Sequence, residues 1–134
     1  MKQILVLLMF MLGTVNLNSQ AMGSKADDSI TVKEGKWDAT YYGNTYKGRR
    51  HTANGDVFNM NAMTCAAHKM FPFGTRLRVT NTQNGKSVIV KVTDRGGFAT
   101  RHPHRLDLTY GAFGKIAAHR LGVISIKVEV LKNN

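Results

Sequence analysis

The sequence predicts a mainly β protein, a small β-barrel with one short helix, and three observations predict it. Apolar and polar residues alternate strictly over Ile124 to Val130, which is the period of a strand. Thr75 to Thr80 and Ser87 to Asp94 also alternate, and Asn84-Gly85 between them is a typical hairpin turn. Elsewhere short strand-like segments are separated by long loops, and there is one helical pattern. This inventory favours a barrel over a sheet of alternating strands and helices.

The N-terminus reads as an export signal. Lys2 is the only charge before an apolar run from Ile4 to Leu12, and that run is too short to be a stable membrane anchor. Ser19-Gln20-Ala21 has small residues at the spacing that a signal peptidase requires. The expected segments are a signal peptide over 1–21, a flexible polar leader over 22–31 and a single folded domain over 32–134.

The domain is expected to open with a strand and a long loop. Trp37 to Tyr42 is aromatic and partly alternating, which suits a first strand. Tyr46 to Met60 has the composition of a loop, with a strong turn signal at Asn54-Gly55. Ala62 to His68 fits either a short helix or a short buried strand, because its periodicity does not separate the two.

The strand over Ser87 to Asp94 ends at a residue that can carry chemistry. Its β-branched residues indicate a stiff, largely buried strand. The Gly96-Gly97 pair that follows allows the backbone to turn sharply or to approach a ligand. A rigid element that presents one ionisable group at the edge of a fold is a common way of holding a site. Asp94 is therefore a candidate functional residue.

The C-terminal third is expected to contain the helix and the last strand. Leu106-Asp107-Leu108 reads as a short strand or as the approach to a helix. Thr109 can cap a helix over Tyr110 to Leu121, whose apolar residues share one face, and Gly122 follows its end. The alternating strand over Ile124 to Val130 then completes the domain.

The chain is strongly basic, with 19 Lys and Arg residues against 8 Asp and Glu residues and a formal net charge of +11. A compact domain with this excess is attracted to polyanions. For an exported protein these are the cell wall, anionic lipid surfaces or extracellular polymers, and nucleic acid fits the compartment poorly. The charge is spread along the sequence, so a role in solubility alone stays open.

Two acidic residues of the domain are functional candidates. Asp56 follows the Asn54-Gly55 turn, and Asp94 ends a strand. Either could instead bond its own backbone in a turn, which is the commoner role of an aspartate. Asp107, between two leucines, is expected to be structural.

Histidine and cysteine patterns suggest metal or thiol chemistry, and neither is favoured. His102-Pro103-His104 can ligate a metal, but no third ligand is implied, so no metal site is expected. Cys65 and His68 invite a cysteine-hydrolase interpretation. The small apolar neighbours of Cys65 favour instead a buried cysteine that behaves as a small hydrophobe. Cys65 is the only cysteine, so no intramolecular disulfide can form. His119 is expected to be an incidental residue on the charged side of the helix.

Taken together, these residues resemble the RlpA-like family of double-psi β-barrels. The resemblance covers about Gly35 to Leu131 and is specific because the motifs keep their order and spacing. The matching motifs are Ala39-Thr40-Tyr41-Tyr42-Gly43, His51-Thr52-Ala53-Asn54-Gly55, Met60-Asn61-Ala62-Met63-Thr64, Ala66-Ala67-His68, Pro72-Phe73-Gly74-Thr75, Val79-Thr80-Asn81, Asn84-Gly85, Asp94-Arg95-Gly96 and Leu106-Asp107-Leu108.

The resemblance implies a six-stranded double-psi β-barrel with a groove across one face, and action on peptidoglycan glycan strands as in the septal lytic transglycosylases. The family's acidic residue after Ala-Asn-Gly falls on Asp56, its histidine on His68 and its Asp-Arg-Gly aspartate on Asp94. This chain has the shorter Asp56 where family enzymes commonly have glutamate, and Gly97 where they often have proline. We expect no cofactor, no separate glycan-binding repeat domain and no lipid anchor.

In the enzyme hypothesis one carboxyl group, that of Asp94, protonates the glycosidic oxygen between N-acetylmuramic acid and N-acetylglucosamine. The resulting carboxylate then takes the proton of the muramic C6 hydroxyl, which closes an anhydro ring without water. Asp56 or His68 is expected to orient the sugar or to adjust the charge state of Asp94. The substrate-binding residues expected around them are Tyr41, Tyr42, Arg95 and Phe98.

Two other classes of function compete with the enzyme. One is a wall-binding module without turnover, as in expansins, which needs the groove and the basic surface alone. The other is the cysteine hydrolase of Cys65 and His68. The expected partner is the peptidoglycan glycan strand, met by a monomer in the periplasm or at the extracellular wall. Nucleic acid and a stable membrane anchor after signal cleavage are not expected.

Overall fold

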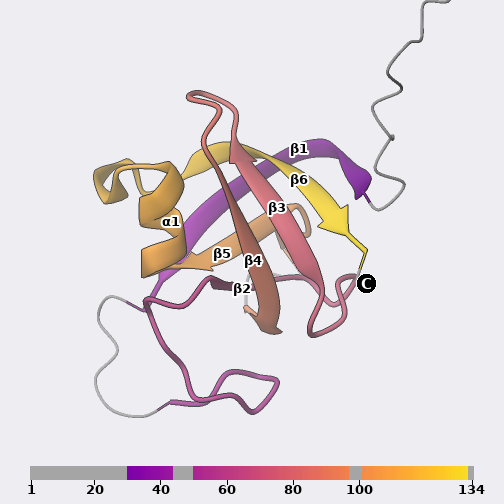
Figure 1. The fold of residues 1–134 in the computed structure, drawn as a ribbon, viewed down its shortest axis with the longest axis vertical. Coiled ribbons are helices and arrows are strands. Elements are labelled where there is room, and N and C mark those ends of the chain that lie inside the picture. The colour runs from indigo at the N-terminus through magenta and orange to yellow at the C-terminus, as the bar shows by residue number, and fades with distance from the viewer. Residues whose placement is uncertain (1–29, 44–49, 97–100, 133–134) are drawn as a thin grey trace, which may run out of the picture.

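The computed structural model describes residues 30–43, 50–96 and 101–132. The predicted signal peptide, Gly97 and Phe98 lie outside these residues. Within them six strands close into a barrel that carries one short α-helix (Figure 1), which confirms the mainly β barrel that the sequence predicts. No helix in this part of the chain is long and apolar enough to cross a membrane. The elements are β1 (Ile30–Tyr42), β2 (Thr64–Ala66), β3 (Arg76–Asn81), β4 (Ser87–Asp94), β5 (Arg105–Thr109), α1 (Tyr110–Ile116), the 3₁₀ helix η2 (His119–Leu121) and β6 (Ile124–Leu131).

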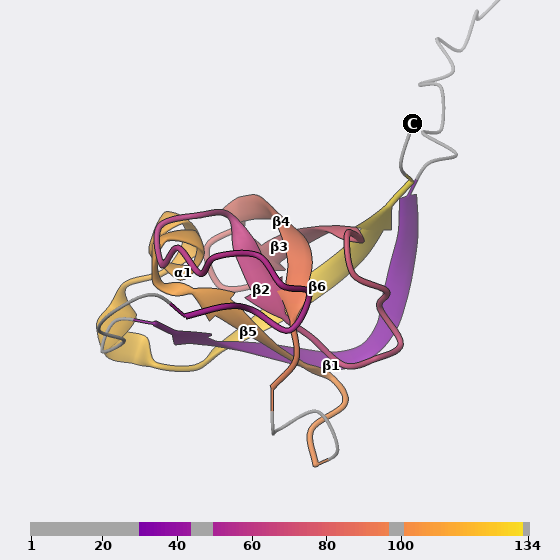
Figure 2. The same ribbon diagram turned by 90° about the horizontal axis from the view of Figure 1, so that it is seen from below.

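The strand order around the barrel is β1-β5-β2-β4-β3-β6. Two pairs, β1 with β5 and β2 with β4, are parallel, and the other four are antiparallel. The start of β1 and the end of β6 pair with each other and extend together beyond the barrel (Figure 2). The described part of the long loop between β1 and β2, residues 50–63, crosses one end of the barrel, below β4 in Figure 1. That segment carries Asp56, so the topology brings it to the strand that carries Asp94.

The local sequence signals identify most strands. The predicted hairpin is present, because β3 and β4 pair through Thr80 and Ser87 on either side of the Asn84-Gly85 turn. The ambiguous segment Ala62 to His68 forms the short strand β2, and Leu106-Asp107-Leu108 lies in β5. β1 begins at Ile30, two residues before the predicted start of the domain.

The barrel is filled by the inward-facing residues of alternating strands. Pairs such as Leu77 with Val90 are completely or almost completely buried. Cys65 is also fully buried in this core. Phe113 and Ile116 of α1 are fully buried in the same cluster, so the helix is held to the barrel by its apolar face.

The helix ends earlier than predicted. Thr109 caps its start as expected, since its hydroxyl accepts a hydrogen bond from the Ala112 amide. However, α1 stops at Ile116 instead of Leu121. The side-chain amides of Asn81 and Asn84 both donate to the Ile116 carbonyl at 2.9 Å, and they satisfy a group that every helix end leaves open. The hairpin therefore terminates the helix.

His119 is a structural residue, so its prediction as incidental is wrong. Its ring stacks on Tyr110 with 3.6 Å between ring centres, and its Nε2 lies 2.7 Å from the Tyr110 carbonyl oxygen. The Tyr41 hydroxyl donates to the His119 carbonyl at 3.1 Å. These contacts fix η2 against α1 and β1, a role that only the folded chain reveals.

Candidate active site

A β-bulge at the end of β4 directs Asp94. Cys65 of β2 pairs with Val92, but the next residue, Ala66, pairs with Asp94, so Thr93 is an extra residue on β4. Bulges change the direction of side chains and are frequent beside active sites. As a result Asp94 lies on the same face of the sheet as Ala66.

This face carries a row of residues across four strands. Ala66 pairs not only with Asp94 but also with Asp107 of β5, and Asp107 pairs with Thr40 of β1. Residues that are directly paired across strands point to the same face. We call Thr40, Asp107, Ala66 and Asp94 the carboxyl row. In it, two carboxyl groups flank the small side chain of Ala66.

Three donors hold the Asp94 carboxylate. Its Oδ1 accepts hydrogen bonds from the backbone amides of Ala53 and Arg95, both at 2.9 Å. Its Oδ2 accepts one from the Tyr42 hydroxyl at 3.3 Å. The long loop is tied to the same strand end a second time, because the Asn54 amide donates to the Thr93 carbonyl at 3.0 Å. Asp94 is therefore fixed by its strand, by β1 and by the long loop.

Tyr42 is a permanent hydrogen-bond donor to Asp94. Burial is the largest cause that raises the pKa of its phenol, and the negative charge of Asp94 and their hydrogen bond raise it further. The phenol thus stays protonated and can only donate toward the carboxylate. Its ring packs against Phe58 with 5.2 Å between ring centres. The sequence predicted Tyr42 as a substrate-binding residue, which stays a prediction, and the structure adds the contact of its hydroxyl with Asp94.

Asp107 was predicted to be structural only, and the structure also places it in the carboxyl row with Asp94. Burial raises its pKa, and the charge of Asp94 raises it further, whereas the hydrogen bond from Thr40 Oγ1 at 2.9 Å and the charge of Arg105 lower it. The contact with Thr40 agrees with the predicted structural role. The coupling to Asp94 is new, and its signal in the sequence is the Leu-Asp-Leu alternation, which turns Asp107 away from the two core leucines.

The raised pKa of Asp107 gives a testable pH dependence of stability. The folded state binds the Asp107 proton more tightly than the unfolded state, so its stabilising contribution is present at low pH and is lost as pH rises through the folded pKa. We expect D107N, which does not titrate and can still accept from Thr40, to melt with wild type at about pH 3 and a few degrees higher at about pH 7. Thermal melts over this range check it, and a lower melting temperature for D107N at about pH 7 would contradict it.

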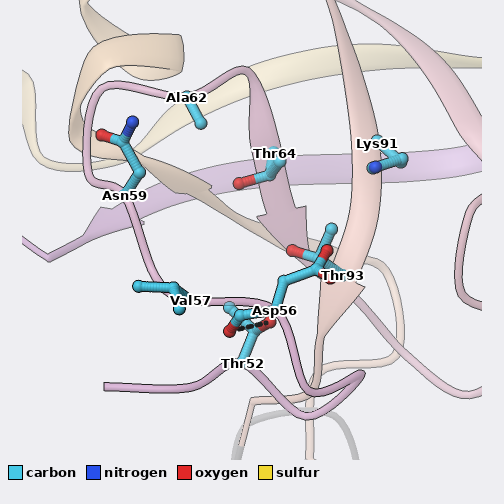
Figure 3. A pocket seen from close by; sticks show the side chains of 8 residues that line it. All are labelled: Thr52, Asp56, Val57, Asn59, Ala62, Thr64, Lys91 and Thr93. Atoms are coloured by element: carbon cyan, nitrogen blue, oxygen red, sulfur yellow. Dashed lines mark hydrogen bonds between the residues drawn. The ribbon is translucent and has the colours of Figure 1, made fainter. Parts of the chain in front are cut away.

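Asp56 lines a pocket beside the carboxyl row (Figure 3). The pocket has a volume of about 280 Å³ and is formed between the long loop and the outer faces of β2 and β4. Thr64 and Lys91, which pair across these strands, form its wall. They precede Ala66 and Asp94 of the carboxyl row along β2 and β4. The exposed Asp56 carboxylate accepts from the Asn54 side-chain amide at 2.9 Å. We call this the Asp56 pocket; its lining residues are Thr52, Asp56, Val57, Asn59, Ala62, Thr64, Lys91 and Thr93.

His68 lies at the same end of the barrel without bonding to either candidate carboxylate. Its neighbour Ala67 donates its amide to the Asp94 carbonyl at 3.1 Å, which places His68 just beyond the β2–β4 pair. Its Nδ1 accepts from the Met70 amide at 3.1 Å, so the ring is oriented by its own turn. Among the described residues, no hydrogen bond joins the side chains of His68, Asp94 and Asp56.

Arg95 holds the turn after β2 against the end of β4. Its guanidinium donates to the carbonyls of Phe71 at 2.9 Å, Asp94 at 3.3 Å and Ala67 at 3.5 Å. It also lies over the ring of Phe73, with 4.0 Å from its central carbon to the ring centre. This clamp was not foreseen from the sequence, and the predicted contact of Arg95 with substrate remains a prediction.

The other predicted residues lie elsewhere. The Tyr41 ring is packed with Phe113 and His119, at 4.8 and 5.0 Å between ring centres, on the α1 side of β1. Phe98 lies outside the described residues. Cys65 is fully buried, and burial is the main cause that raises the pKa of its thiol to about 12. A thiolate nucleophile is therefore disfavoured, and the buried small hydrophobe is the correct interpretation.

No three His, Cys, Asp or Glu side chains in the described ranges gather so as to hold a metal ion. The described candidate residues offer carboxyl groups, hydroxyls, one imidazole and one lysine. Such groups can transfer protons and bind the hydroxyl and amide groups of a sugar.

Comparison with known proteins identifies the family. The family model described as lytic transglycolase matches residues 36–128. The endolytic peptidoglycan transglycosylase RlpA of Vibrio cholerae is 43% identical over 94 residues, which are 69% of this chain and 34% of that protein. The protein of the same name from Neisseria meningitidis serogroup A is 45% identical over 92 residues, or 68% of this chain and 36% of that protein. The chain spans about a third of the length of these curated relatives.

A solved structure supports the same fold. The expansin of Clavibacter michiganensis superimposes with a TM-score of 0.61 at 22% identity, covering 74% of this chain and 50% of the expansin. The fold, the motifs and the match over residues 36–128 agree, so the chain belongs to the lytic transglycolase family of RlpA-like double-psi β-barrels.

Proposed function

We propose that this domain is an endolytic peptidoglycan transglycosylase, which cleaves the bond between N-acetylmuramic acid and N-acetylglucosamine. The observation that carries the proposal is the carboxyl row, where the bulge at Thr93 turns Asp94 to the face that also bears Asp107. The printed names of the relatives from Vibrio cholerae and Neisseria meningitidis support the substrate class.

In the proposed reaction Asp94 acts as acid and then as base. Its carboxyl group gives a proton to the glycosidic oxygen as the bond between that oxygen and the muramic C1 breaks. The resulting carboxylate takes the proton of the C6 hydroxyl of the same sugar, and that oxygen bonds to C1. The product carries a 1,6-anhydro ring, and no water is consumed. The fixed position of Asp94 suits this reaction, because a general acid must lie within about 3 Å of the oxygen it protonates.

The neighbours of Asp94 have supporting roles in this proposal. Burial raises the pKa of Asp107 and the charge of Asp94 raises it further, so the site disfavours the ionisation of both carboxyl groups together. Asp56 and His68 approach from the long loop and the turn after β2, and we assign them the orientation of the sugar. We also propose that Phe98, predicted from the sequence as a substrate-binding residue, stacks on a sugar ring.

The proposal includes the cellular setting. The apolar N-terminal run supports export, and the net charge of +11 supports association with an anionic wall polymer in the periplasm or outside the cell. We propose that the domain acts as a monomer on glycan strands. Sedimentation of the purified protein would measure this directly.

Muropeptide analysis tests the proposed function. Isolated sacculi incubated with the protein should release fragments that end in 1,6-anhydro-N-acetylmuramic acid, detected by mass spectrometry. If the protein bound sacculi but released no such fragments, the expansin-like wall-binding module would replace the enzyme. Release of fragments with reducing ends would indicate hydrolysis instead.

Removal of the Tyr42 hydroxyl should slow the reaction. Y42F keeps the ring contact with Phe58 and deletes one donor to Asp94, so we expect the initial rate of anhydro-product release to fall about 3- to 10-fold. The matched control is Y110F on α1, whose ring stacks on His119 and which has no hydrogen bond to Asp94, and it should keep the wild-type rate. Equal rates for Y42F and wild type would remove the hydroxyl from the mechanism.

A further inference from the structure

The Asp56 pocket contains a polar group that the described protein leaves without a partner. Thr93 is 2% exposed, and its hydroxyl makes no hydrogen bond with the described residues. Buried polar groups are almost always paired in native proteins, so an exception calls for an explanation. Thr93 is also the bulged residue next to Asp94 and lines the pocket. A ligand in the pocket is the nearest source of the missing partner.

The rest of the pocket has a defined chemical character. Lys91 is exposed and makes no ion pair within the described ranges, so its ammonium can donate to a ligand. Asp56 and the Thr64 hydroxyl offer acceptors, and Val57 and Ala62 form an apolar part of the wall. At about 280 Å³ the pocket lies just below the usual ligand-pocket range of roughly 300–1,000 Å³. It can therefore hold one sugar unit or a substituent of it.

We propose that the Asp56 pocket binds the 2-acetamido group of an N-acetylated sugar in the glycan strand. This inference rests on the proposed function, since it specifies what the same groove recognises. An acetamido group needs an acceptor for its N–H, a donor for its carbonyl and an apolar surface for its methyl group. Thr93 accepts from the N–H, Lys91 donates to the carbonyl, and Val57 contacts the methyl. The methyl and hydroxyl of Thr93 are similar in size, so a rotation about Cα–Cβ turns the hydroxyl to the ligand.

The position of the pocket explains why this recognition matters for cleavage. Thr64 and Lys91 precede Ala66 and Asp94 along the paired strands β2 and β4, so the pocket and the carboxyl row follow each other on one face. A sugar anchored by its acetamido group is thereby placed next to Asp94. A glucan has only a hydroxyl at the same carbon, so it lacks the carbonyl that Lys91 would bind and the methyl group that Val57 would contact, and a site built for those groups should discriminate against it.

Binding of two neutral oligosaccharides tests the proposal. Chitohexaose carries the acetamido groups, whereas cellohexaose has hydroxyls at the same positions. Calorimetric titration of D94N, in which turnover is suppressed, should give tighter binding of chitohexaose by about 10-fold or more. Adding T93V to D94N should weaken chitohexaose binding about 3- to 10-fold and leave cellohexaose binding unchanged. K91Q, at an exposed site where substitutions usually change stability little, should have the same selective effect.

Controls separate this proposal from misfolding and from the proposed function. T93V removes a hydroxyl with no protein partner, so its melting temperature should not fall. T80V on β3, outside the pocket, should bind both sugars as the parent does. Equal affinities of D94N for the two sugars, no binding of either, or an unchanged chitohexaose affinity in both T93V and K91Q would overturn the inference. Chitohexaose selectivity together with no anhydro products from sacculi would refute the transglycosylase and keep the acetamido site.

Discussion

D94N is expected to abolish the release of anhydro-muropeptides from sacculi, with a fall in rate of about 100-fold or more. General acid–base catalysis contributes about 10²–10⁴-fold, and the proposed reaction uses Asp94 in both proton transfers. An asparagine can neither give a proton to the glycosidic oxygen nor take one from the C6 hydroxyl. The measurement is the initial rate of product release, followed by mass spectrometry at equal protein concentration.

D94N should remove the proton transfer and leave the fold in place. The asparagine Oδ1 can still accept from the amides of Ala53 and Arg95, so the loop should stay attached to β4. We therefore expect a melting temperature close to that of wild type and undiminished binding to sacculi. E34Q, an equal change at an exposed carboxylate on β1, should keep full activity. If D94N released anhydro products at the wild-type rate, Asp94 would have no part in the chemistry.

The local pattern of the sequence was sufficient for the β3–β4 hairpin and β6, and it marked Asp94 as a candidate. Strict alternation and an Asn-Gly turn predict the β3–β4 hairpin and β6. These signals can be recognised because they involve residues that are neighbours in the chain. The parallel pairs β1–β5 and β2–β4 join segments far apart in sequence, so no local pattern predicts them. The early end of α1 has the same cause, since Asn81 and Asn84 reach the Ile116 carbonyl from a distant turn.

The composition of the site was only partly predictable for a related reason. Asp94 could be recognised because it ends a strand. The pairing of Asp94 with Asp107 depends on the register of three strands and on a bulge of one residue at Thr93. A shift of one residue reverses the face to which a side chain points, and no local pattern encodes such a shift. Asp56 lies at the end of the barrel where it was expected from the sequence. The pocket that it lines has walls from two separate strands, which the sequence does not show.

Loss of the Arg95 side chain is expected to cost both stability and activity. R95A leaves the carbonyls of Phe71, Ala67 and Asp94 without this donor and removes the cation–π contact with Phe73. Hydrogen bonds to charged groups contribute about 1.5–3 kcal/mol each, so a loss of roughly 2–4 kcal/mol is expected for this partly exposed clamp. The melting temperature should fall by about 10 °C or more.

The conservative variant R95K separates the clamp from a contact with substrate. A lysine keeps the positive charge, but it lacks the planar fork that bonds to several carbonyls and lies flat on Phe73. If Arg95 acts as a clamp, R95K should lose most of the stability and activity that R95A loses. If Arg95 only attracts the carboxylates of peptide stems, R95A should melt like wild type, and R95K should bind and cleave sacculi like wild type. R120A, which removes an exposed positive charge on η2, is the matched control and should melt like wild type. The Arg95 guanidinium bonds to the backbone carbonyl of Asp94, so loss of this clamp would displace the Asp94 carboxylate and lower the catalytic rate. Loss of a charge that only attracts substrate would weaken binding alone.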